Sequence, residues 1–175
     1  MKPSEKNFVH LYTGDGKGKT TAAIGLAVRA AGHGMKTYIG QFMKGQLYGE
    51  LTALKNHPLI TIEQFGDTKC IRREDVTQNH IDQALQGLDM AKNAMLSGQY
   101  DILVMDEINV TVWFGLLSVK DVIDVLNQRP ENMEVILTGR NAPEELIDAA
   151  DLVTEMKEVK HYYTQGVLAR DGIER

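Results

Sequence analysis

The chain is built around the segment Tyr12-Thr13-Gly14-Asp15-Gly16-Lys17-Gly18-Lys19-Thr20-Thr21. An apolar run at residues 8–12 precedes this segment and is typical of a strand, whereas the alanine-rich run at residues 22–31 that follows is typical of a helix. A strand, a glycine-rich loop ending in Gly-Lys-Thr and a helix together form an arrangement that binds phosphate groups. The segment therefore predicts a phosphate-binding loop that opens a helix.

Each part of this loop has a physical role toward a polyphosphate. The glycines let backbone N–H groups turn inward onto an anion, and the helix N-terminus adds its partial positive charge. Lys19 would reach the distal phosphates, while the Thr20 hydroxyl would ligate a magnesium ion. We expect Lys19 to be exposed, so that Lys19→Ala would abolish turnover and leave the fold intact. The candidate nucleotide-binding residues of the loop are Gly14, Asp15, Gly16, Lys17, Gly18, Lys19, Thr20 and Thr21.

The spacing of the glycines departs from the usual pattern. That pattern places a glycine five residues before Gly18, but Thr13 occupies this position and the glycine follows at Gly14. The loop is thus one residue shorter between its glycines, and it carries an additional Lys17. A glycine-rich turn with two solvated lysines is the alternative, but the flanking strand and helix favour a phosphate site. The departure suggests that the triphosphate does not sit in the usual register.

Length, composition and charge limit the class of protein. A chain of 175 residues, 43% hydrophobic and 25% charged, is expected to form one globular domain spanning residues 1–175. The net charge of -5 gives no general basic character of the kind that binds nucleic acid. No segment is typical of a signal peptide or a membrane span, and Cys70, the one cysteine, cannot form an internal disulfide. We therefore expect a cytoplasmic protein that binds neither nucleic acid nor a membrane.

Strand-like and helix-like segments alternate along the chain. Because such alternation is typical of a parallel sheet with helices on both faces, we expect an α/β fold whose ligand lies at the carboxyl ends of the strands. Residues 66–73, which include Cys70, are expected to be irregular. The expected strands are residues 8–12, 35–43, 59–65, 100–105, 133–138 and 152–156. The expected helices are residues 20–33, 50–56 and 74–97, a helix that begins at 118 and ends before Pro130, and a short helix that residues 141–144 open.

An acidic pair, Asp106 and Glu107, ends the most apolar strand. Carboxylates at that edge could hold magnesium directly or through water, and could divide metal ligation and general base chemistry between them. The alternative is that they only end the strand, but the phosphate loop favours a metal site. Arg140 ends the next strand and would contact the nucleotide rather than remain a surface arginine. Arg29, two turns into the first helix, would either contact the nucleotide or form a structural ion pair.

Other residues near predicted strand ends have less certain roles. Lys44, Lys160 and His161 lie just past strands, although a lone histidine in such a place is more often structural than catalytic. Trp113 and Phe114 follow the acidic strand and belong either to the core or to the wall of a pocket for a flat ligand. The residues alone thus predict an ATP- or GTP-dependent enzyme with magnesium. A kinase, a hydrolytic motor or switch, and an alkyl transferase that expels the polyphosphate all remain open.

The chain resembles the ATP:corrinoid adenosyltransferases of cob(I)alamin synthesis. The loop at residues 13–23 is similar to that family's phosphate loop, including its shortened glycine spacing. The resemblance covers nearly the whole chain, because further segments match in order: residues 29–34, 41–45, 49–50, 103–108, 137–140, 150–156, 159–161, 166–167 and 172–174.

This resemblance implies a P-loop, RecA-like fold, a homodimer, and binding of ATP with Mg²⁺. It implies that a reduced corrinoid, with Co(I) as nucleophile, attacks C5′ of ATP and that tripolyphosphate leaves. It also implies that the triphosphate is bound in a register reversed from that of kinases. A flavoprotein or another reductase would supply the electron. Carried over, residues 14–21 hold the phosphates, Thr20 and Glu107 flank the metal, and Arg140 lies near the nucleotide. Lys19, Glu107 and Arg140 are the expected catalytic residues; a small-molecule kinase or ATP hydrolase is the alternative.

The resemblance also implies an apolar wall against the lower corrin face, which would favour four-coordinate cobalt. Many family members carry an aromatic pair in a Gly-Phe-Thr-Trp segment there, whereas this chain has Gly66-Asp67-Thr68-Lys69-Cys70-Ile71. Phe65 and Ile71 are the bulky apolar residues of that region, and Trp113 is a further candidate. We therefore expect these three residues at the corrinoid pocket.

Overall fold

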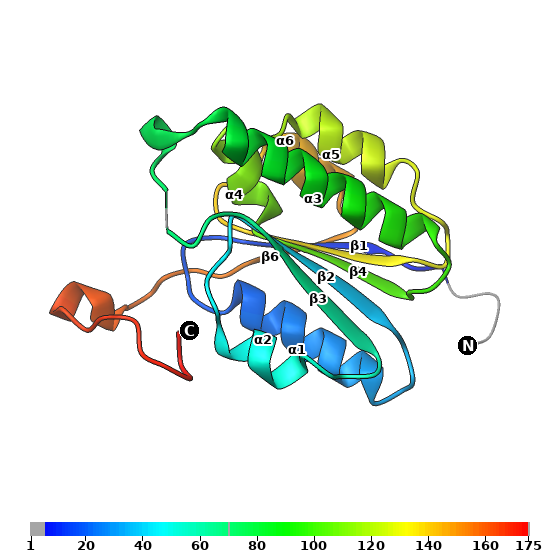
Figure 1. Ribbon diagram of the computed structural model, residues 1–175, viewed down its shortest axis with the longest axis horizontal. Helices are drawn as coiled ribbons and strands as arrows, with labels where there is room; N and C mark the ends of the chain where they lie inside the picture. The colour runs from blue at the N-terminus through cyan, green and yellow to red at the C-terminus, as the bar shows by residue number, and fades with distance from the viewer. Residues whose placement is uncertain (1–5, 70, 175) are drawn as a thin grey trace.

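The fold is seen in a computed structural model, which describes residues 6–69 and 71–174 (Figure 1). Cys70, expected in an irregular segment, lies outside the described residues. One six-stranded sheet forms the centre, with strand order β3-β2-β4-β5-β1-β6. Its strands are β1 Val9–Thr13, β2 Thr37–Phe42, β3 Ile60–Phe65, β4 Ile102–Asp106, β5 Glu134–Thr138 and β6 Leu152–Glu155.

Every pair of neighbouring strands is parallel. The predicted α/β fold with a mostly parallel sheet is therefore confirmed. Because β1 lies between β5 and β6 while β2 lies between β3 and β4, the first crossover passes over the middle of the sheet. All six carboxyl ends point to one edge, where ligands of such sheets bind.

Helices cover both faces of the sheet (Figure 1). α1 and α2 lie below it in this view, and α3, α4, α5 and α6 lie above it. Among the described residues, no helix has the length and apolar character needed to cross a bilayer. The α-helices are α1 Lys19–Ala31, α2 Gly49–Leu54, α3 Gln78–Leu96, α4 Ile108–Trp113, α5 Val119–Leu126 and α6 Glu144–Ala149, and the 3-10 turns are η1 Arg73–Asp75 and η2 Tyr162–Gln165.

Because successive side chains of a strand point to opposite faces of the sheet, the core is divided into two layers. In β4, Leu103 and Met105 face the layer under α3 and α5, whereas Ile102 and Val104 face the layer under α1. Strands buried on both faces read as continuous apolar runs, which is why this segment could be recognised from sequence. The α1 layer is completed by small side chains that let the helix approach the sheet closely, namely Ala23, Ala27 and Ala30.

The structure departs from the sequence prediction mainly in its helices. The helix predicted over residues 74–97 is in fact a short turn, η1, followed by α3 from Gln78. The break has a local cause, because Val76 is extended and Thr77 forms a capping box with His80. α4 directly follows the acidic pair, and neither α4 nor η2 is among the expected helices.

At Gly87, α3 packs closely against side chains of the sheet. A Cβ atom added there would lie 2.7 Å from Phe65 Cγ and 2.9 Å from Phe42 Cε1. Both rings belong to packed strands and have little room to move. We expect Gly87→Ala to destabilise the protein by about 1–3 kcal/mol through overpacking. Thermal unfolding would measure this, with Gly25→Ala as the control, because a Cβ at Gly25 meets nothing within 4 Å.

Candidate active site

The carboxyl edge of the sheet carries one large cavity, of about 740 Å³. This volume lies within the range of pockets that bind small molecules, roughly 300–1,000 Å³. Five segments far apart in sequence meet there: the loop after β1, the loop after β2, the acidic end of β4, the turn after β5 and the chain after β6. Its lining residues are Asp15, Gly16, Lys17, Gly18, Lys19, Thr20, Thr21, Ile24, Lys44, Tyr48, Gly49, Glu50, Glu107, Arg140, His161, Gly172, Ile173 and Glu174.

The phosphate loop is pressed against the chain that follows β6. The Gly16 N–H donates a 2.6 Å hydrogen bond to the Met156 carbonyl. A Cβ at Gly14 would lie 2.6 Å from the same carbonyl oxygen, and one at Gly16 would lie 2.5 Å from it. Gly14 also has a φ of 91°, a region that favours glycine. These two glycines therefore allow close packing as well as an open anion cradle.

The N-terminus of α1 faces the cavity without a side-chain cap. Its N-cap is Gly18, whose φ is 120°, and no side chain caps the helix. The first turn contains no acidic residue. The first N–H groups of a helix lack intrahelical partners and carry partial positive charge. This end of α1 is therefore suited to an anionic ligand.

Lys19 is buried rather than exposed, so that expectation is wrong. Only 7% of the residue is accessible, and Nζ donates 2.7 Å hydrogen bonds to the carbonyls of Gly14 and Gly16. The side chain folds back along its own loop, which sequence spacing does not specify. Burial lowers the pKa of Lys19, although Glu107 opposes this shift. The ammonium is held at the cavity wall with little water around it.

Asp106 lies at the centre of a polar network beneath the cavity and is 1% exposed. Its Oδ1 accepts hydrogen bonds from the Thr20 and Thr138 hydroxyls, at 2.8 and 2.6 Å. Its Oδ2 accepts from Lys44 Nζ at 2.7 Å and from Gln41 Nε2 at 3.3 Å. The network thus joins the ends of β2, β4 and β5 to the start of α1. Sequence reasoning had placed Thr20 and Asp106 at one metal site, and they are in direct contact.

Glu107 follows in a left-handed conformation, with a φ of 63°, and begins α4. Its backbone N–H donates to Thr138 Oγ1 at 2.9 Å, and its side chain lines the cavity. Burial and the neighbouring Asp106 carboxylate raise the pKa of Glu107, while Lys44, Lys19 and Arg140 oppose the shift. A cation bound close to the Glu107 carboxyl group would lower its pKa and favour the charged carboxylate.

The two candidate arginines have different placements. Arg140 follows β5 and lines the cavity, after a turn in which Gly139 has a φ of 129° and its carbonyl accepts from Asn109 Nδ2 at 3.0 Å. Arg29 lies in the last turn of α1, exposed and outside the residues that line the cavity. Contact of Arg29 with a nucleotide stays a prediction that this arrangement does not favour.

Residues 156–174, here called the C-terminal strap, run away from the sheet and return to the phosphate loop (Figure 1). Lys17 Nζ contacts Glu174 Oε1 at 2.7 Å, the Ile173 carbonyl at 3.0 Å and the Tyr162 hydroxyl at 3.4 Å. Arg170 and Tyr162 also bind the Glu174 carboxylate. The strap therefore forms one wall of the cavity, and Lys17 holds it.

This contact gives a test of local order. We expect Glu174→Gln to release the strap, because the carboxylate is shared by Lys17, Arg170 and Tyr162. Hydrogen exchange of amides in residues 157–174 should accelerate by at least about tenfold. The melting temperature should stay within about 1 °C, since surface charge pairs add little to global stability. Lys120→Met, which removes an exposed ion pair in α5, is the control that should leave strap exchange unchanged.

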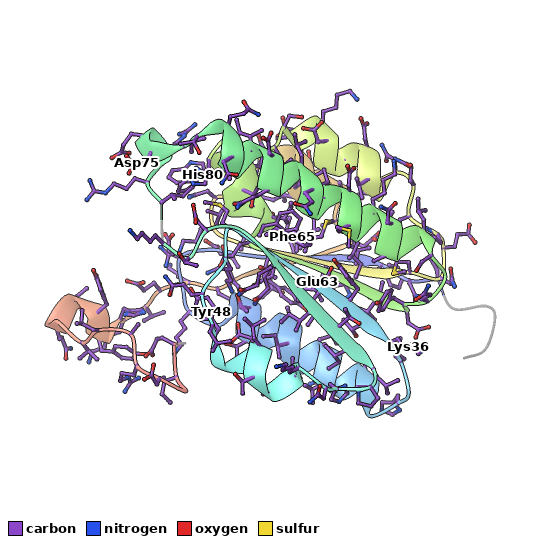
Figure 2. The ribbon with its side chains drawn as sticks, viewed as in Figure 1. Lys36, Tyr48, Glu63, Phe65, Asp75 and His80 are labelled. Atoms are coloured by element: carbon purple, nitrogen blue, oxygen red, sulfur yellow. The ribbon has the colours of Figure 1, made fainter. Side chains whose placement is uncertain are left out.

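The three candidate corrinoid residues do not form one cluster. Phe65 and Ile71 line a second, much smaller cavity that also borders Asp67, Lys69 and His80. Phe65 packs on the α3 side of the sheet against Phe42, with ring centroids 5.9 Å apart (Figure 2). Trp113 is not among the residues that line this cavity; it lies at the end of α4, where it is 44% exposed and stacks with Arg73. Their contact with a corrinoid stays a prediction.

The described side chains supply only part of the coordination shell of a magnesium ion. Within residues 6–69 and 71–174, no group of three or more His, Cys, Asp or Glu side chains could hold a metal. The donors at hand are the Thr20 hydroxyl and the Asp106 and Glu107 carboxylates. These hard oxygens suit Mg²⁺, which keeps several waters and commonly completes its shell with substrate phosphates. The donor set therefore fits a metal that enters with a polyphosphate.

Sequence reasoning missed several residues of the site. Gln41 and Thr138 are polar residues at strand ends, a signal that could have identified them as partners of Asp106. Lys44 was noted after a strand but given no role. Tyr48 carried no signal of its own, and residues 172–174 matched the family but were given no role, because irregular loops bring them to the cavity.

Comparison with known proteins adds an independent observation. The model of the protein family described as ATP:corrinoid adenosyltransferase BtuR/CobO/CobP matches residues 5–175. The corrinoid adenosyltransferase of Escherichia coli strain K12 is 34% identical over 172 residues, and corrinoid adenosyltransferase CobA of Salmonella typhimurium is 37% identical over 173 residues. Each alignment covers 97% of this chain and 86% of the relative.

An uncharacterized protein of Nostoc sp. is 37% identical in an alignment 167 residues long that covers 87% of this chain and 44% of that protein. This chain therefore spans less than half the length of that relative, but most of the two enzymes named above.

Proposed function

The chain belongs to the ATP:corrinoid adenosyltransferase family, and from this membership we propose that it transfers the 5′-deoxyadenosyl group of ATP to the Co(I) centre of a reduced corrinoid. In this reaction the cobalt electron pair attacks C5′. The bond between C5′ and the phosphate oxygen breaks, its electrons remain on that oxygen, and tripolyphosphate leaves. The observation that carries the proposal is the group of cations around the cavity, at the free N-terminus of α1.

The residues of this chain would act mainly by placing and neutralising the polyphosphate. A good nucleophile needs no general base, so the protein must align Co(I) with C5′ and stabilise charge on the departing group. Lys19 and Arg140 line the cavity and would do this, and the N–H groups of residues 17–20 would bind phosphate oxygens. The Lys17 ammonium could bind phosphate oxygens only if it gave up its contact with the Glu174 carboxylate. The corrinoid would approach from the open side of the cavity.

Magnesium fits the donor set described above, where Thr20, Asp106 and Glu107 would hold it. When bound, it would neutralise charge on the polyphosphate oxygens. The raised pKa of Glu107 agrees with such a place, because a cation would favour its carboxylate form.

Partners are proposed on the family's pattern. A flavoprotein or another reductase would supply the electron that forms Co(I), and the chain would act as a homodimer. Size-exclusion chromatography with light scattering would test the second point, and a single-chain mass would contradict it.

The experiment for the function combines the protein with ATP, Mg²⁺ and chemically reduced cob(I)alamin. We expect a light-sensitive adenosylated corrinoid to appear in the absorbance spectrum. Formation of ADP from ATP, with the corrinoid unchanged, would instead indicate a kinase or a hydrolase. A sample without corrinoid provides the control for background ATP hydrolysis.

We expect the affinity for ATP to depend on pH in the alkaline range, because three lysines line the cavity. The hydrogen bond to Glu174 raises the pKa of Lys17. Burial alone would lower the pKa of Lys44, but Asp106 outweighs it and the pKa is raised. Lys19 has its pKa lowered by burial, so it loses its charge first, below the usual value of 10.5. ATP affinity should therefore fall as pH rises through that lowered pKa.

Calorimetric titration of ATP from neutral pH upward would measure this decline. In Lys19→Arg, which keeps its charge, the decline should move to higher pH, whereas Lys17→Met should leave its midpoint in place. A midpoint that moves in Lys17→Met and not in Lys19→Arg would contradict the assignment.

A further inference from the structure

Lys44 occupies an unusual position beside the proposed metal donors. It follows β2 after Met43, whose φ of 55° turns the chain sharply at the carboxyl edge of the sheet. The next residue, Gly45, must be small, because a Cβ there would lie 2.7 Å from the carbonyl carbon of Asp67. The turn is thus fixed by backbone packing, and it aims the lysine at the end of β4.

The ammonium of Lys44 contacts two oxygen groups at once. Nζ lies 2.7 Å from Asp106 Oδ2 and 3.3 Å from Thr20 Oγ1. It also lies 5.3 Å from the centroid of the Tyr48 ring, which Figure 2 labels at the opposite end of the sheet from Lys36. The side chain is 14% exposed, so solvent screens this charge weakly.

These contacts have a consequence for metal binding. Thr20 and Asp106 are the oxygen donors that the proposed magnesium site requires. A divalent ion on the same oxygens would stand next to a buried monovalent cation, and their repulsion would be strong at such short range. The ammonium in this position and a metal ion on Asp106 therefore exclude each other.

We propose that Lys44 is a positioning residue whose ammonium occupies the place of Mg²⁺ beside Thr20 and Asp106. Its ammonium keeps Thr20 and Asp106 aligned, and it keeps free Mg²⁺ out until a polyphosphate enters the cavity. The phosphates then offer the ammonium a second anionic partner, because Lys44 already lines that cavity. Metal entry is thereby coupled to nucleotide entry. This inference rests on the proposed function for the identity of the metal donors.

A purely structural ion pair makes a different prediction. If Lys44 only stabilised Asp106, its loss would lower stability without creating affinity for a metal. Lys44→Met should retain the fold, because Asp106 keeps hydrogen bonds from Thr20, Thr138 and Gln41. The two explanations are therefore separated by metal binding in the absence of nucleotide.

The test measures Mn²⁺ binding by electron paramagnetic resonance with no nucleotide or corrinoid present, and it repeats the measurement on the wild type with ATP. Lys44→Met should bind one Mn²⁺ per chain at least about tenfold more tightly than the wild type. Adding Mg²⁺ should raise its melting temperature by roughly 5 °C and leave that of the wild type unchanged. Lys44→Arg, which keeps the charge, should behave as wild type. Lys36→Met is the matched control, because it removes an exposed lysine from the other end of β2.

Two results would overturn the proposal. One is a Lys44→Met protein that binds Mn²⁺ no more tightly than the wild type. The other is a wild type that binds one Mn²⁺ without ATP as tightly as with it, a measurement that stands even if the variant fails to fold. Since no arm contains a corrinoid, failure of adenosylation in the separate assay would contradict the proposed function alone.

Discussion

Replacing Lys19 with alanine should lower the rate of corrinoid adenosylation by about 10²–10³-fold, the range found when a key charge-stabilising donor is removed. Lys19 begins α1 at the cavity wall, and its burial leaves its charge poorly screened by water. Its two hydrogen bonds to loop carbonyls also hold the loop closed on itself. The variant therefore loses both charge and loop order. Single-turnover rates with cob(I)alamin and saturating ATP would measure the effect.

The buried position of Lys19 requires a stability control. Loss of its hydrogen bonds should cost on the order of 1–2 kcal/mol, which leaves the protein folded. Circular dichroism and thermal unfolding would verify this before rates are compared. Lys160→Ala, which changes an exposed lysine of the strap outside the cavity lining, should retain full activity. A folded Lys19→Ala protein with near-normal rates would remove the argument from the phosphate loop.

Asp106→Ala should lower the free energy of unfolding more than any other variant proposed, and it should also abolish turnover. Removing a carboxylate that is 1% exposed leaves the Lys44 ammonium without its partner and the Thr20 and Thr138 hydroxyls without their acceptor. Breaking a buried charge pair in this way costs about 3–5 kcal/mol. For a chain of this size, the melting temperature should fall by roughly 10 °C.

Asp124→Ala is the matched control for this variant, because it breaks an exposed ion pair with Lys120 in α5. Its melting temperature should stay within about 1 °C of the wild type. The double variant Asp106→Ala with Lys44→Met should recover part of the lost stability, since it removes both charges. If Asp106→Ala and Asp124→Ala melted at the same temperature, the buried network would not matter for the fold.

The architecture could be predicted because its signals are local. The glycine loop between a strand and a helix identified the nucleotide end, and the continuous apolar run of β4 identified a central strand. Since parallel strands share one carboxyl edge, Asp106, Glu107 and Arg140 could be assigned to the same site as Thr20. The structure brings all four residues to that edge.

Other features depended on long-range contacts that periodicity does not encode. The exposure of Lys19 was predicted wrongly, because the fold of its side chain onto Gly14 and Gly16 depends on loop conformation. Segments of the strap matched the family, but the strap carries no regular pattern, so its contact with Lys17 could not be predicted. The expected helix over residues 74–97 began too early, because the capping box at Thr77 uses His80 in place of the usual acidic partner.

The most direct test of the central claim is to identify the phosphate product by phosphorus NMR while adenosylated corrinoid is formed from cob(I)alamin, ATP and Mg²⁺. We predict one intact tripolyphosphate for each cobalt–carbon bond formed, with none produced by Lys19→Ala. ADP, or free phosphate in amounts that match the ATP consumed, would contradict attack at C5′ and leave only the nucleotide site standing.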